Sequence, residues 1–131
     1  MLHYTEKYVS ARIREAETSF KEKLLLVGVV LPQMELIESV KVIRLLLECA
    51  LHTRPSYDEL DALCEVSETS ELLHDYLRGF FIDDTRDPVR LEMAQRLEGV
   101  ISLRISGRKA KSASTHKLRQ TVAEYLLRAR N

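Results

Sequence analysis

The sequence predicts an all-α protein, and three observations support this class. Apolar residues recur at steps of three and four through most of the chain, which is the spacing of one helix face. Capping residues and prolines divide the chain into segments of helical length. Only four Gly and three Pro occur among 131 residues. We therefore expect a single compact helical bundle of about five to six helices, one helical domain over residues 1–131.

The first helix is expected from about Thr5, a suitable N-cap, to about Val27. Gly28 is suited to the left-handed conformation that ends a helix, and Pro32 to the first turn of the next helix. The apolar residues of this first segment step by three or four and draw one stripe, formed by Val9, Ile13, Ala16, Phe20, Leu24 and Val27.

The second helix, about residues 32–51, is apolar nearly all round, which predicts a central position in the bundle. It is expected to end before Pro55, because a proline lacks a donor and pushes Arg54 towards extended geometry. Ser56 and Glu59 then have the spacing of a capping box. A short third helix of about residues 57–66 should follow.

A fourth helix is expected at about residues 68–81, and the acidic turn after it leads to Asp87 and Pro88. Asp87 is placed as an N-cap and Pro88 as the first residue of a fifth helix that runs to about residue 104. A basic connection separates this helix from the sixth, at about residues 115–129.

An alternative fold contains two β-strands. Residues 101–106 alternate apolar and polar side chains, and residues 24–30 are an apolar run that tolerates β structure. These two stretches are able to pair, which would give an α+β protein with a small two-stranded element.

The cysteines and the hydropathy indicate a protein of the cytoplasm. Cys49 and Cys64 lie in apolar helical patterns without metal-binding or redox-motif spacing, so we expect two buried free thiols. The longest apolar run, residues 24–31, is far shorter than the roughly 20 residues of a membrane-spanning helix. The first residues lack the features of a secretory signal.

No catalytic motif is present, so we expect no enzyme activity and no cofactor. Glu71 and His74 have the spacing of half a di-iron site, but one copy is too few to hold metal. Glu48 and His52 are a second pair at the end of a helix. We expect both pairs to face solvent and the chain to hold no metal.

Net zero charge conceals a division along the chain. Residues 101–131 hold eight Lys or Arg and one acid, whereas the first hundred residues carry a net charge of −7. The division predicts a basic contact surface for a charged partner, with the acidic turn 83–87 as a second contact. The expected contact residues are Arg104, Arg108, Lys109, Lys111, Lys117 and Arg119.

The resulting hypothesis is a non-enzymatic protein-interaction module, such as an adaptor, antitoxin or immunity-like protein, that docks a charged protein partner. One alternative is nucleic-acid binding through the same basic region, where Ser112, Ser114 and Thr115 are able to contact phosphate. Another is self-assembly into a homodimer or larger homo-oligomer through the stripe of the first helix. A competing interpretation has the basic segment neutralised by the acids of its own chain.

Overall fold

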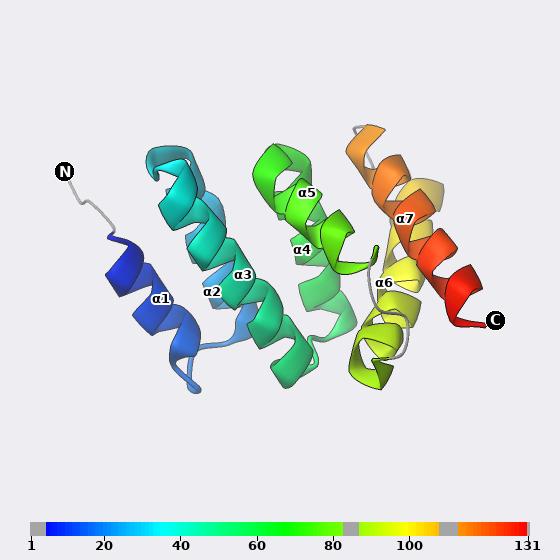
Figure 1. Cartoon of the computed structure of the whole chain (residues 1–131), viewed down its shortest axis with the longest axis horizontal. Coiled ribbons are helices and arrows are strands. Elements are labelled where there is room, and N and C mark those ends of the chain that lie inside the picture. The colour runs from blue at the N-terminus through cyan, green and yellow to red at the C-terminus, as the bar shows by residue number, and fades with distance from the viewer. Residues whose placement is uncertain (1–4, 83–86, 108–112, 131) are drawn as a thin grey trace. The chain divides into compact units, whose positions relative to one another are not determined.

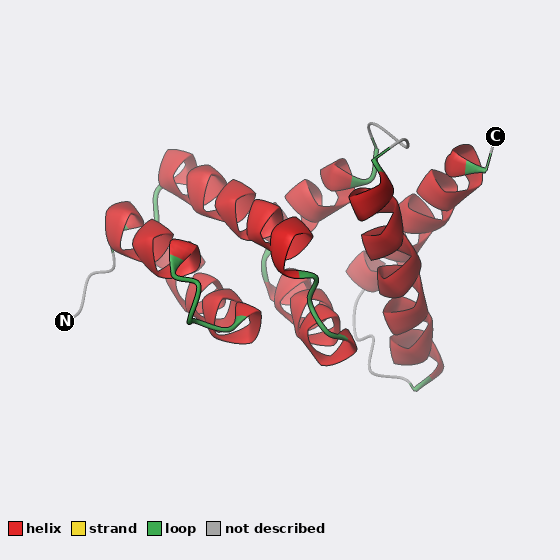
Figure 2. Cartoon of the chain, turned by 90° about the horizontal axis from the view of Figure 1, so that it is seen from below, coloured by secondary structure: helices red, strands yellow, loops and turns green. Residues whose placement is uncertain are grey.

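The computed structural model describes residues 5–82, 87–107 and 113–130 (Figure 1). Within these ranges the chain forms seven α-helices and one 3-10 helix, and no strand (Figure 2). The all-α prediction is confirmed, and the expected count of five to six helices is slightly too low. The elements are α1 (Glu6–Arg14), α2 (Phe20–Val30), η1 (Leu31–Gln33), α3 (Leu36–Thr53), α4 (Tyr57–Thr69), α5 (Glu71–Phe80), α6 (Pro88–Ser106) and α7 (Ala113–Ala129).

Two compact units divide these helices. The first covers Met1–Pro55 and contains α1, α2, η1 and α3; the second covers Ser56–Asn131 and contains α4 to α7. The expected single domain over residues 1–131 stays a prediction. None of the helices in the described part of the chain is long and apolar enough to cross a membrane.

In the first unit, the single helix expected to span residues 5–27 is two helices. Thr5 caps α1 as predicted, but α1 ends at Arg14, and Glu15 adopts an extended conformation. Ser19 then caps α2 by accepting a hydrogen bond from the amide of Glu22. This local cap competes with continuation of the first helix. The apolar stripe cannot reveal the break, because its members stay buried on both sides of it, except for the exposed Ala16.

The boundary between α2 and α3 also differs from the prediction. Gly28 lies inside α2, which continues to Val30, so the expected helix end at Gly28 is wrong. Pro32 belongs to the 3-10 helix η1, whose turn is closed by a hydrogen bond from the amide of Met34 to the carbonyl of Leu31. This tighter turn accommodates the proline and delays the start of α3 to Leu36.

At the other end of α3, Arg54 is left-handed, with φ 49° and ψ 73°, and not extended as expected. A single left-handed residue after the last helical residue is a common way to end a helix. Pro55 follows it, so the predicted boundary is confirmed although the conformation of Arg54 is not.

Both stretches considered as strands are helical: residues 24–30 lie in α2 and residues 101–106 in α6. Burial repeats at helical spacing in each of them, at Leu24, Val27 and Val30 and again at Ile101 and Arg104. The α+β alternative is therefore wrong for the described chain.

The second unit consists of two helical hairpins, α4 with α5 and α6 with α7. The first helices of the hairpins pack against each other, as do the second helices, which is how stacked helix pairs of α-solenoids pack. Asp87 and Pro88 begin α6 as N-cap and first helical residue, as predicted. The rings of Phe81 and Tyr125 pack edge to face, with their centroids 5.6 Å apart, and this contact joins the end of α5 to α7.

The predicted capping box opens α4. The Ser56 hydroxyl accepts from the Glu59 amide at 3.2 Å, and the Glu59 carboxylate accepts from the Ser56 amide at 3.0 Å. Two backbone donors that the first turn leaves free are thereby satisfied.

We expect Ser56→Ala to lower the free energy of unfolding by about 1 kcal/mol, because the Glu59 amide loses its acceptor. Ser56→Asp keeps an acceptor at the cap and serves as the matched control. Urea denaturation followed by circular dichroism measures both variants. A Ser56→Ala variant as stable as the unsubstituted chain would contradict this account of the α4 start.

Candidate functional site

The six predicted contact residues have three different positions in the structure. Arg104, on α6, is buried with 4% of its side chain exposed. Lys117 and Arg119 are exposed on α7. Arg108, Lys109 and Lys111 lie outside the described residues, as does most of the acidic turn, residues 83–86.

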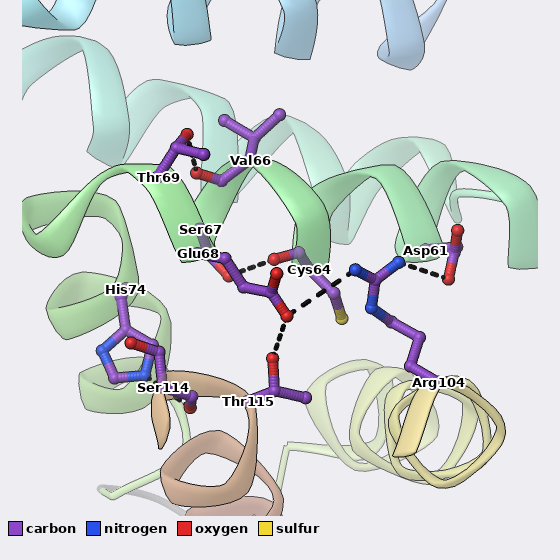
Figure 3. A network of polar contacts seen from close by, with 10 residues as sticks. All are labelled: Asp61, Cys64, Val66, Ser67, Glu68, Thr69, His74, Arg104, Ser114 and Thr115. Carbon is purple, nitrogen blue, oxygen red and sulfur yellow. Dashed lines mark hydrogen bonds and ion pairs between the residues drawn. The ribbon is translucent and has the colours of Figure 1, made fainter. Parts of the chain in front are cut away.

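Arg104 lies in a polar network between the helices of the second unit (Figure 3). Its Nη1 donates to Asp61 Oδ1 at 2.9 Å, and its Nη2 lies 3.6 Å from Glu68 Oε1. Both acids belong to α4, one about two turns after the other. The guanidinium therefore links α6 to α4 through two carboxylates.

Glu68 extends this network to α7. Its carboxylate also accepts a hydrogen bond from the Thr115 hydroxyl. Next to it, His74 Nε2 donates to the Ser114 carbonyl at 2.9 Å, so α5 is bonded to the same turn of α7 (Figure 3). The first turn of α7 is thus held from two helices at once.

His74 is only 5% exposed, so its expected position facing solvent is wrong. The helical period alone placed Glu71 and His74 together, but Glu71 is exposed whereas His74 turns inward. The acceptor that explains the burial, the Ser114 carbonyl, is forty residues away in the sequence. Glu48 and His52, the other pair, are exposed as predicted.

Charge compensation keeps Arg104 ionised in this buried position. Burial acts to lower the pKa of Arg104, but the hydrogen bond and charge of Asp61 and the charge of Glu68 raise it above its usual value. Cys64, on α4, lies beside the same network, and burial raises its pKa to about 12 despite the opposing charge of Arg104. At neutral pH the Cys64 thiol therefore remains protonated.

A cavity of about 250 Å³ opens next to the ion pair. Asp61 and Arg104 line it together with Tyr57, Asp58, Val100 and Leu103. The guanidinium of Arg96 lies over the ring of Tyr57, 4.9 Å from its centroid. Asp61 pairs with Arg104 Nη1, whereas the buried Arg104 Nε has no hydrogen-bond partner within the described residues. Asp58 adds a second carboxylate to the cavity lining, beside apolar groups.

The other cations of the last helix point away from this network. Lys117, Arg119 and Arg128 are exposed on α7 and Arg130 is exposed directly after it, and we call these four residues the α7 basic face. Arg128 also donates from Nη2 to the carbonyls of Phe81 and Ile82, the end of α5, at 3.0 and 3.2 Å. Lys117, Arg119 and Arg130 form no ion pair within the described residues.

No protein-family model, curated protein or solved structure matches this chain. Within the described residues, no three His, Cys, Asp or Glu side chains come together in a group able to hold a metal ion.

We expect Arg104→Leu to destabilise the chain by about 3 kcal/mol, because it leaves the Glu68 carboxylate largely buried and without its cation. Arg119→Leu is the matched control, since Arg119 is exposed, and it should change stability by less than about 0.5 kcal/mol. Urea unfolding of both variants makes the comparison. Equal effects would show that the Arg104 network does not stabilise the fold.

Proposed function

We propose that this chain is a non-enzymatic protein-interaction module that docks an acidic surface of a partner protein against the α7 basic face. The observation that carries the proposal is that the buried cation of the second unit is paired with acids, whereas exposed cations of α7 and its end are not. The inward cation Arg104 is matched by two carboxylates, whereas Lys117, Arg119 and Arg130 are exposed and form no ion pair within the described chain.

The spacing of these cations supports a contact along the length of the helix. Lys117 and Arg128 are eleven residues apart, as are Arg119 and Arg130, and eleven residues make about three turns. Lys117 and Arg128 therefore follow one edge of the exposed face, and Arg119 lies on the other edge, with Arg130 directly after the end of the helix. Leu127 is exposed on this face, so an apolar contact lies among charges that set orientation and association rate.

A protein partner is favoured over nucleic acid by the start of α7. The Thr115 hydroxyl, expected as a phosphate contact, is buried and donates to Glu68. The Ser114 carbonyl accepts from His74, which fixes the backbone of the same turn towards α5. Of the three expected phosphate contacts, Thr115 is thus engaged within the chain, and Ser112 lies outside the described residues.

Self-assembly through the first apolar stripe has little support. Val9, Ile13, Phe20, Leu24 and Val27 are at most 4% exposed, so the stripe is covered within the first unit. We retain a cytoplasmic location as part of the proposal, because both cysteines are free and reduced thiols are typical of that compartment.

The test compares two variants of equal net charge, Lys117→Glu with Arg119→Glu, and Lys7→Glu with Lys41→Glu. Both pairs reverse two exposed lysines or arginines, but only the first pair lies on α7. Proteins that co-purify from nuclease-treated extract of the native cell are quantified by mass spectrometry. We expect the α7 variant to lose its partner by about tenfold or more, and the control to retain it.

The same proteins captured equally by both variants would overturn the proposal. A mobility-shift assay with generic RNA at low salt covers the nucleic-acid alternative. Retardation that disappears in the α7 variant and falls steeply with salt would replace the protein partner by nucleic acid.

A further inference from the structure

In the first unit, a lysine occupies a core position of α2. Lys23 lies on the same inward face as Phe20, Leu24 and Val27, and it is only 4% exposed. An ammonium in such a position has lost most of its water, and its charge requires compensation from nearby groups.

The group that Lys23 contacts is a thiol. Its Nζ lies 3.5 Å from Cys49 Sγ, on α3, and donates to it. A protonated thiol is a weak acceptor, whereas a thiolate is both a strong acceptor and a counter-charge for the ammonium. The contact therefore places a positive charge beside the atom that acts as the nucleophile in thiol chemistry.

Small molecules are able to reach this sulfur. Cys49 is partly exposed, and both Cys49 and Lys23 line an open cavity of about 260 Å³ at the end of the first unit. Charged or titratable groups from α1 and α3 share the lining, namely Arg14, Glu48 and His52. The charges of Arg14 and Glu48 are opposite, so Lys23 is the cation in direct contact with the sulfur.

Cys64 provides the contrast within the same chain. It is 1% exposed, and burial raises its pKa to about 12. The chain thus contains one accessible thiol beside an ammonium and one inaccessible thiol that stays protonated.

We propose that Cys49 is a redox-sensitive site, oxidised to a sulfenic acid by a hydroperoxide of small size, with Lys23 assisting the reaction. The Cys49 thiolate attacks one oxygen of hydrogen peroxide, so that an S–O bond forms and the O–O bond breaks. The departing hydroxide takes a proton from the Lys23 ammonium and leaves as water. Sulfur is oxidised by two electrons and peroxide is reduced, which gives a sulfenic acid and a neutral amine.

The full chain is treated with hydrogen peroxide, and sulfenic acid is trapped with dimedone and located by peptide mass spectrometry. We expect the adduct on Cys49 and none on Cys64. Lys23→Met keeps the length of the side chain but removes its charge, and it should slow trapping at Cys49 by about tenfold. Lys21→Met, at an exposed position of the same helix, is the control and should react like the unsubstituted chain.

A measurement on the unsubstituted chain protects the test against a variant that fails to fold. The rate of Cys49 oxidation in the native chain is compared with the rate in denaturant. Faster oxidation of native Cys49 supports an activating environment. Oxidation that is slower in the native chain, or equal labelling of Cys49 and Cys64, would overturn the proposal.

Discussion

A guanidinium removed from water must be matched by acceptors and negative charge, and this requirement at Arg104 organises the second unit. Asp61 and Glu68 supply the negative charge from one helix, so Arg104 of α6 is bound to two points along α4. The buried Arg104 Nε has no hydrogen-bond partner within the described residues. Asp61 remains 37% exposed and Glu68 only 10%. Most of the cost of disrupting the network therefore falls on Glu68, the acid that also receives the Thr115 hydroxyl.

The same network determines which groups of α7 are left for other molecules. Thr115 and Thr121 are buried; Thr115 donates to Glu68, and Thr121 accepts from Arg78 Nε at 2.9 Å. The inward face of α7 makes these contacts and packs Leu118, Val122 and Tyr125 into the core. The lysine and arginines of the helix therefore lie on its outward face. The exposed charge of α7 thus follows from how its other face is held.

Sequence reasoning succeeded where the signal is local. The capping box of Ser56 and Glu59 and the cap formed by Asp87 and Pro88 involve residues within one turn, and both are present as predicted. It failed where a competing local cap interrupts an unbroken apolar period, as Ser19 does before α2. It also failed to place Arg104 and His74, because their partners are 43 and 40 residues away in the sequence. The prediction from the charge division treated Arg104 as a surface cation. Its spacing of four and three residues after the buried Val100 and Ile101 would have predicted an inward position.

Lys23 and Arg104, the lysine and the arginine that are buried among the described residues, show how partners decide the role of a charge. Arg104 meets two carboxylates, which link α6 to α4, so its position is structural. Lys23 meets a thiol, a group that becomes a good partner only when it loses its proton and thereby becomes a nucleophile. Burial makes compensation of the charge necessary at both cations, and the partner of each cation decides whether its role is structural or, as we propose for Lys23, to assist a reaction.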